Sequence, residues 1–458
     1  MKIFVLCSAL LVPASMALGA TPSTPTQKSP SAQTASSLES VDNLSNGLKF
    51  AYKIDRIAPR VALSLQVRVG ASDETAQNAG WRRFYAGAVA RGVPSASASS
   101  VNTSDGLGLA RLAERLGGEA GVSVGDDVME FWATGDSANA PQLMALLVGM
   151  WKSPRLSDED IAKARTSLEN QLDAQDLDLA AQTSAALRTQ EFRNAKGEVT
   201  SYGLSEIGTT ASLANLTNER LRELGKRVAS SPATVSAVGD VNTAGLSSYL
   251  TSLPKPSVAP ASAPQFAPLK AGKPALVVRD VPTQTAWVFV SYPLGHVKPE
   301  DAPAMRVLSA SLSDITNARL TKRLLGGPLV DGAPSALSLS SQFIYRRDGS
   351  ELFLSAQTSA SRVEKVKNAL IEEVSKLKTA PLSATEFAQA RDFARGDWGL
   401  ARQSMRDRAF LVGQAPTLVG VPDGTWPVRL AKLTPQSTQE AAKRVIGAYV
   451  VALVMPRS

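Results

Sequence analysis

The chain repeats itself, and this internal duplication limits the folds open to it more than any other feature. Residues 156–165 read LSDEDIAKAR and residues 382–391 read LSATEFAQAR, so five positions agree at an offset of 226. A second pair follows in the same order. Residues 216–228 and 433–445 both begin with Leu-Thr and end with Lys-Arg-Val, at an offset of 217. Two ordered matches indicate a chain made of two related halves.

Stretches rich in Pro, Ser, Thr and Ala mark where these halves begin and end. Residues 21–38 carry too little apolar surface to fold and predict a flexible tether, which we place at 21–43. The proline-rich stretch 254–274 predicts a linker. The N-terminal domain is therefore expected at residues 44–253 and the C-terminal domain at 275–458, each of ordinary domain size.

The first 20 residues have the pattern of a secretory signal peptide. Lys2 supplies the positive start, residues 3–18 are mostly apolar, and small residues at 17–20 offer a cleavage site. Cys7 is the one cysteine of the chain and lies within this segment without a lipobox, so the mature chain is expected to have neither disulfides nor thiolate metal ligands. A periplasmic or secreted location is predicted.

Charge and composition exclude several classes of function. The formal charge is +8, but the basic residues are interspersed with acidic ones, and aromatic residues make up only 5% of the chain. This combination argues against nucleic acid as a partner and favours an ordinary solvated basic surface. No apolar run of 18 residues follows the signal peptide, so no membrane span is expected after cleavage.

Local periodicity predicts an α+β fold. Apolar residues alternate from Val61 to Val69, which is typical of a half-buried strand. Residues 161–172 and 363–377 instead have apolar residues three and four positions apart, the pattern of amphipathic helices. We expect each half to be a largely antiparallel sheet covered by helices on one face.

Several short motifs resemble the pitrilysin/insulinase zinc peptidases, the family that includes the mitochondrial processing peptidase. They lie in the family's order over nearly all of the mature chain: Asn46-Gly47-Leu48, Gly80-Trp81-Arg82-Arg83-Phe84-Tyr85, Leu116-Gly117-Gly118-Glu119, Pro154-Arg155-Leu156-Ser157 and Val238-Gly239-Asp240-Val241. The resemblance implies two homologous halves with this family's metallohydrolase fold.

The family's zinc motif is degenerate here. Active members carry H-x-x-E-H on the helix after the first strand, because positions i, i+3 and i+4 share a helix face. The aligned residues are Arg83, Ala86 and Gly87, and the third ligand, a Glu on a later helix, aligns with Gln171. The opposite stripe of the first helix stays apolar, with Trp81, Phe84, Tyr85 and Ala88. The resemblance therefore implies a protein without zinc or another cofactor.

The remaining candidate groups do not restore a catalytic site. His296 is the only histidine and is interpreted as an exposed turn residue. The resemblance also implies a carbonyl-holding Arg and Tyr in the second half, whose positions fall near Leu325 and Ser335, with Arg323 as a near substitute. A solvated helix face is the simpler interpretation of Arg319, Lys322 and Arg323.

A peptide-binding strand is the feature most compatible with loss of catalysis. In the family, an edge strand after Leu-Gly-Gly pairs with substrate, and here that strand is Gly121, Val122, Ser123 and Val124. Backbone pairing needs no particular side chains, so peptide binding is able to outlast catalysis. An internal or protected strand is the alternative.

The resulting hypothesis is a catalytically inactive peptidase homologue, not itself an enzyme. It would act as the non-catalytic subunit of a heterodimer with an active, zinc-bearing member of the same family. The alternative is a stand-alone periplasmic peptide-binding or chaperone-like module.

Overall fold

The computed structural model describes residues 39–97, 107–269, 276–281, 283–326, 334–420 and 422–456. The predicted signal peptide and residues 21–38 of the predicted tether lie outside these ranges. The end of the tether is placed wrongly, because Ser40–Asn43 forms strand β1 and pairs antiparallel with β2 (Lys49–Ile54). The four residues of β1 lack apolar alternation, and the pairing partner supplies the order that the local sequence does not.

The first half contains a six-stranded sheet in the order β1-β2-β6-β3-β5-β4. Its other strands are β3 (Arg60–Val67), β4 (Glu119–Val124), β5 (Met129–Asp136) and β6 (Ala233–Gly239). Only β2 and β6 run parallel, and the remaining pairs are antiparallel. The sheet is largely antiparallel, as the sequence predicts.

The second half repeats this sheet with one strand fewer. Its order is β7-β11-β8-β10-β9, and its single parallel pair is β7 with β11. The strands are β7 (Leu276–Val281), β8 (Ala286–Gly295), β9 (Ser338–Ile344), β10 (Ser350–Thr358) and β11 (Val450–Pro456). When the strands are taken in chain order, β2 to β6 of the first half occupy the same places in their sheet as β7 to β11 of the second half. This correspondence confirms the duplication.

Helices build one core in each half. In the first half these are α1 (Trp81–Arg91), α2 (Gly108–Arg115), α3 (Ala140–Lys152), α4 (Asp158–Asp176), α6 (Thr210–Ala214), α7 (Asn218–Ser230) and α8 (Thr243–Thr251). In the second they are α9 (Ala302–Ser313), α10 (Val363–Thr379), α11 (Ala384–Leu400), α13 (Trp426–Ala431) and α14 (Pro435–Val445). The two largest clusters of buried apolar side chains lie one in each half, and smaller clusters form where α5 (Leu179–Glu191) and α12 (Met405–Gln414) pack on the sheets.

The duplicated sequence segments form equivalent helices with the same kind of start. Ser157 caps α4 by accepting a hydrogen bond from the Asp160 backbone, and Ser383 caps α11 in a full capping box with Glu386. The second pair, α7 and α14, also begins with a capping threonine. The predicted helix starts are confirmed at these positions.

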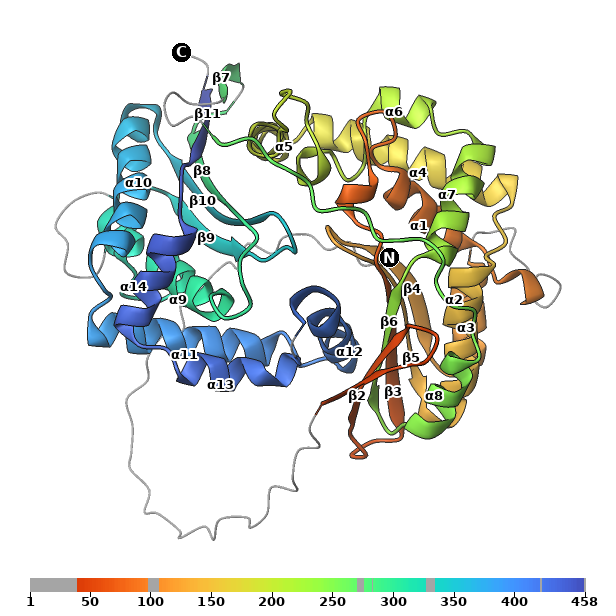
Figure 1. Cartoon of the computed structure of the whole chain (residues 1–458). Helices are drawn as coiled ribbons and strands as arrows, with labels where there is room; N and C mark the ends of the chain where they lie inside the picture. Colours follow the sequence, from red (N-terminus) through yellow and green to blue (C-terminus); the bar gives the residue numbers. More distant parts are fainter. Residues whose placement is uncertain are drawn as a thin grey trace, which may run out of the picture. The chain divides into compact units, whose positions relative to one another are not determined.

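Each half also lends one helix to the other half's sheet. Helix α5 (Leu179–Glu191) contacts β7, β8 and β11, whereas α12 (Met405–Gln414) contacts β2, β3, β5 and β6 (Figure 1). Strand β3 is therefore buried on both faces, and the half-buried strand expected from its alternation is wrong. Polar Gln66 is fully buried beneath α12. Its side-chain amide donates a hydrogen bond to the Phe410 carbonyl at 2.6 Å.

The described part of the linker makes specific contacts. Residues 254–269 contain no helix or strand, as expected. The Ala267 amide nevertheless donates to the Arg193 carbonyl at 2.7 Å, and the Phe266 ring packs on Phe192 at 5.1 Å between centroids. Within the described ranges, no helix is long and apolar enough to cross a membrane.

Short turns complete the described structure. Three-residue 3-10 turns lie at Ala71–Asp73, Ser95–Ser97, Ser137–Asn139, Ser201–Gly203, Ala360–Arg362 and Asp423–Thr425. Single π turns lie at Thr321–Leu325 and Ala415–Val419.

Candidate functional site

Helix α1 packs one face into the core of the first half. Trp81, Phe84, Tyr85 and Ala88 are each at most 1% exposed, so the predicted apolar stripe is confirmed. Arg82 is also buried, which the sequence does not suggest. Its guanidinium forms an ion pair with buried Glu74 at 3.2 Å and donates to the Gly125 carbonyl at 2.5 Å. Burial raises the pKa of Glu74, although Arg82 counteracts this.

The positions aligned with the zinc motif carry no metal ligand. Arg83 is exposed and lies 3.5 Å from the Glu206 carboxylate, an ion pair of the weak surface kind. Ala86 is buried and Gly87 is half-buried. None of these three residue types ligates zinc in proteins, because the guanidinium of Arg83 stays protonated and the other two have no donor atom.

The residue of α4 that meets the Gly87 position is Ala164. Helix α4 packs against α1, and a Cβ added to Gly87 would lie 3.5 Å from the Cβ of Ala164. Gln171 lies about two turns further along α4, is exposed, and donates to the Ser167 carbonyl at 3.0 Å. Ala164 rather than Gln171 therefore faces the Gly87 position, and neither residue is a zinc ligand.

The other described residues do not form a metal centre either. Among the described residues, no group of three or more His, Cys, Asp and Glu side chains is placed to hold a metal ion. His296 is exposed in its turn, as expected, and its Nδ1 lies 2.7 Å from the Arg347 carbonyl oxygen. A single exposed imidazole without a neighbouring ligand set is a poor metal site.

The candidate carbonyl-holding residues of the second half have structural roles. Arg323 lies in the π turn Thr321–Leu325 and pairs with Glu372 at 2.5 Å and Glu373 at 2.9 Å. Arg319 pairs with Glu386 at 3.1 Å and is mostly buried, so the solvated-face interpretation is wrong for it. The Ser335 backbone amide donates to the Leu324 carbonyl at 2.7 Å, and Leu325 is half-buried.

Strand β4, which contains Gly121 to Val124, lies at the edge of the first sheet. It pairs with β5 alone among the described strands, so the alternative of an internal strand is wrong. Gly121 is required here, because a Cβ would lie 2.7 Å from the Trp132 ring. Ser123 lies 3.4 Å from the Arg406 guanidinium of α12. Helices α1 and α2 border this strand, which places it beside the former metal face.

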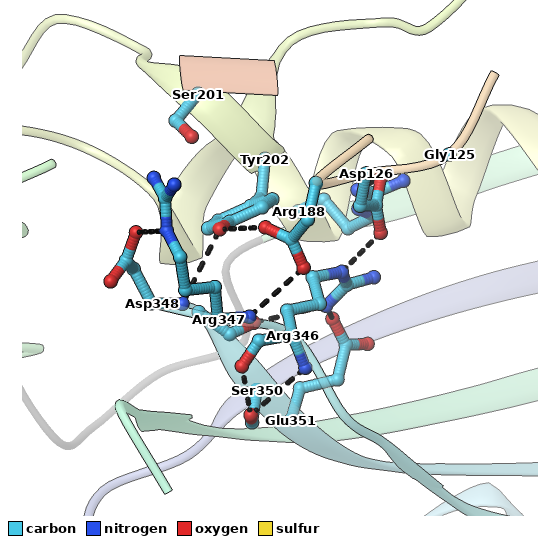
Figure 2. Close-up of polar contacts among 12 residues, drawn as sticks. Gly125, Asp126, Arg188, Ser201, Tyr202, Arg346, Arg347, Asp348, Ser350 and Glu351 are labelled. Atoms are coloured by element: carbon cyan, nitrogen blue, oxygen red, sulfur yellow. Dashed lines mark hydrogen bonds and ion pairs between the residues drawn. The ribbon is translucent and has the colours of Figure 1, made fainter. Parts of the chain in front are cut away.

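The turns that follow the two edge strands meet in a polar cluster (Figure 2). The turn from β4 to β5 contributes Asp126 and Asp127, and the turn from β9 to β10 contributes Arg346 and Arg347. Arg346 is 4% exposed and pairs with Asp126 and, at 2.5 Å, with buried Glu351. The β4–β5 hairpin of the first half and the β9–β10 hairpin of the second half are thus joined by the ion pair of Asp126 with Arg346.

Asp127 also links the two turns, through hydrogen bonds from uncharged donors. It accepts hydrogen bonds from the Tyr202 hydroxyl at 2.6 Å and the Arg347 backbone amide at 2.9 Å. Burial disfavours a charged guanidinium, yet the carboxylates of Asp126 and Glu351 raise the pKa of Arg346. The sequence offers only turn signals here, Gly-Asp-Asp and Arg-Arg-Asp-Gly, and these give no indication that the two turns meet.

A second buried carboxylate lies beside this junction. Glu191, the last residue of α5, is 2% exposed, and neither of its carboxylate oxygens has a hydrogen-bond partner among the described residues. Burial, and next the negative charge of Glu351, raise the pKa of Glu191 well above its ordinary value. This carboxyl group is therefore favoured in its neutral form.

Two matched sheets with exchanged helices, and a metal position occupied by Arg, Ala and Gly, define a peptidase-fold protein without its catalytic metal site. Residues 215–393 match the model of the family described as the Peptidase M16 inactive domain. The match covers less than half of the chain, so it shows a resemblance to the M16 inactive domain in this segment, and the solved structures below show the fold. No curated protein matches the sequence.

Solved structures share the fold over most of the chain. A protease from Helicobacter pylori superimposes with a TM-score of 0.76 at 17% identity and covers 92% of this chain and 100% of its own. A peptidase M16 inactive domain from Pseudomonas fluorescens gives 0.73 at 15% identity, with 92% and 98% covered. An M16-like peptidase from Alicyclobacillus acidocaldarius gives 0.72 at 14% identity, with the same coverage. The predicted two-half α+β fold is confirmed.

Proposed function

We propose that this protein is the non-catalytic subunit of a heterodimer whose other subunit is an active, zinc-bearing M16 peptidase. The observation that carries the proposal is the contrast on α1. The core face is intact, whereas the face that would hold zinc is replaced by Arg83, Ala86 and Gly87. A chain that keeps the packed helices of this fold but lacks the metal ligands is suited to form one wall of a peptide chamber that it shares with an active subunit.

The edge strand supports a role in handling peptides. Strand β4 leaves its outer edge without a strand partner in the described part of the chain, beside α1. An extended peptide adds to such an edge through main-chain hydrogen bonds, and side-chain pockets refine the choice. The partner subunit would then supply the activated water, and this chain would supply part of the peptide grip.

The predicted signal peptide adds a location to the proposal. We place the mature protein in the periplasm or outside the cell, and the active partner must then carry an export signal as well. Fractionation of the native host tests this directly. Recovery of the chain at its full unprocessed length in the cytoplasmic fraction would contradict the location but leave the pairing intact.

Isolation from the native host tests the pairing. The chain should copurify with one active M16 homologue at a one-to-one ratio, and zinc should accompany the homologue. Peptidase activity should require both chains and disappear with a chelator. Recovery of the chain alone, with full activity in the separated homologue, would refute the subunit role.

The second candidate is a stand-alone peptide-binding module, which the unpaired edge of β4 also favours. Such a module purifies alone and retains peptides. Substituting Val122 with Pro in β4 removes a backbone donor from the edge strand and should weaken peptide binding in either case. The ratio of chains in the native isolate therefore separates the two candidates, and the proline variant tests the strand itself.

A further inference from the structure

A cavity of about 300 Å³ lies in the second half, away from the former metal position. It is open on one side and is lined by residues of α9, α11, the end of α12 and α13, together with Phe343 and Tyr345. Four aromatic rings line it, from Phe343, Tyr345, Trp398 and Trp426. Aromatic residues make up only 5% of the chain and tryptophan occurs six times, so this concentration is a local feature rather than general composition.

Three donor atoms of the residues that line this cavity have no hydrogen-bond partner among the described residues. The indole Nε1 atoms of Trp398 and Trp426 are buried and have no hydrogen-bond partner among the described residues, and the same holds for Nε of Arg429. All three are donor groups. All three atoms are shielded from water, so the charges of the lining arginines decide what the cavity can bind.

Three arginines line the cavity, and two of them are already neutralised. Arg306 pairs with Asp314 at 2.8 Å and Asp397 at 3.1 Å. Arg402 lies over the Trp398 ring at 3.9 Å and binds both carboxylate oxygens of Asp423. The charges of these two arginines are therefore matched within the protein.

Arg429 is the exception. Its guanidinium lies over the Trp426 ring at 5.3 Å and donates to the Pro299 carbonyl at 2.6 Å, but no carboxylate of the described residues pairs with it. Burial lowers the pKa of Arg429, although the hydroxyl of Tyr345 and the more distant Asp423 and Glu300 oppose this. A half-buried cation beside aromatic walls, without a counter-ion, marks a place for an anion.

We propose that this cavity is a binding site for an aromatic carboxylate, with the ring against the aromatic side chains and the carboxylate on Arg429. The chemistry is shared by two sources, a free aromatic acid and the C-terminal residue of a peptide ending in an aromatic side chain. The cavity is built from residues 302–429 only, so the proposal does not depend on the heterodimer or on β4.

The test uses the purified chain and three small probes: N-acetyl-phenylalanine, its amide and N-acetyl-alanine. Binding is followed by calorimetry and by tryptophan fluorescence, since two of the six tryptophans line the cavity. The acid should bind about tenfold more tightly than the amide, the factor that corresponds to one charged hydrogen-bond contact. N-acetyl-alanine should bind far more weakly, because it lacks the ring. A pentapeptide ending in phenylalanine, beside its C-terminal amide, distinguishes the peptide source from the small acid.

Variants locate the site. Arg429→Gln should abolish the preference for the acid over the amide, whereas Arg220→Gln, at an exposed arginine of α7, should leave it unchanged. Trp132→Phe, outside the cavity, should preserve the fluorescence response. Binding of neither the acid nor the peptide would overturn the proposal, as would equal affinities for acid and amide in the unmodified chain. The last comparison needs no variant, so misfolding of a variant cannot obscure it.

Discussion

Replacing Arg346 with methionine should destabilise the protein more than removal of any exposed charge. Arg346 is 4% exposed and its partner Glu351 is 2% exposed, so both charges of the pair are out of water. Methionine fills a similar volume but leaves Glu351 without its cation, beside the carboxyl group of Glu191. Breaking a buried pair on one side costs about 3–5 kcal/mol. Since whole proteins are stable by about 5–15 kcal/mol, this is a large fraction.

The assay is urea unfolding at neutral pH, followed by circular dichroism. Arg220→Met is the matched control, because Arg220 pairs with Glu223 at 2.9 Å with both side chains more than half exposed. That surface pair should be worth at most about 1 kcal/mol. In the double variant R346M/E351Q the stranded charge is gone, so part of the lost stability should return. A loss in R346M no larger than in R220M would refute the argument that the two hairpin turns are held together by a buried charge.

Three further outcomes are expected. Glu191→Gln should gain stability relative to the unmodified chain as pH rises, because the raised pKa of Glu191 makes the folded chain bind its proton more tightly. The gain should begin near pH 4.3, the ordinary glutamate value, and be complete above the folded pKa, as thermal melts across pH will measure. Arg406→Met should cost about 1–3 kcal/mol in unfolding free energy, because it leaves buried Glu130 with only the Ser64 hydroxyl as donor; a neutral result would mean that this ion pair does not help to hold α12 to the first sheet. Metal analysis after incubation with zinc should find far less than one ion per chain, and stoichiometric, chelator-sensitive zinc would contradict the degenerate site.

The features visible in the sequence were those with a local physical signal. Apolar periodicity gave the strands and helices, and the repeated LSxxxxAxAR segments correctly indicated two equivalent helices, α4 and α11. The absence of the zinc motif can also be read from the local sequence, since the motif occupies three positions on one helix. The contact of Gly87 with Ala164, two turns from Gln171 on α4, could not be predicted because a local sequence match does not fix which residues of two helices meet.

Features that depend on contacts distant in the chain could not be predicted. The burial of both faces of β3 comes from α12, more than 300 residues away, and alternation along β3 reports only the apolar face. The pair of Arg346 with Asp126 joins turns 220 positions apart. Polar residues at turns normally indicate solvent, so their burial is decided by a partner surface that the local sequence does not encode.

The contact between α1 and α4 bears on whether catalysis could be restored by returning the lost ligands. A His and a Glu that share a zinc ion hold their helices apart by an imidazole, the metal and a carboxylate. Here glycine and alanine let the helices approach, because an added Cβ at Gly87 would already meet Ala164 at 3.5 Å. Returning donor atoms to these positions would therefore also require α1 and α4 to move apart. This contact lies on the face of α1 opposite its apolar stripe, so adding donor atoms there would have to displace α4, and the surfaces that we propose for binding are the β4 edge and the aromatic cavity.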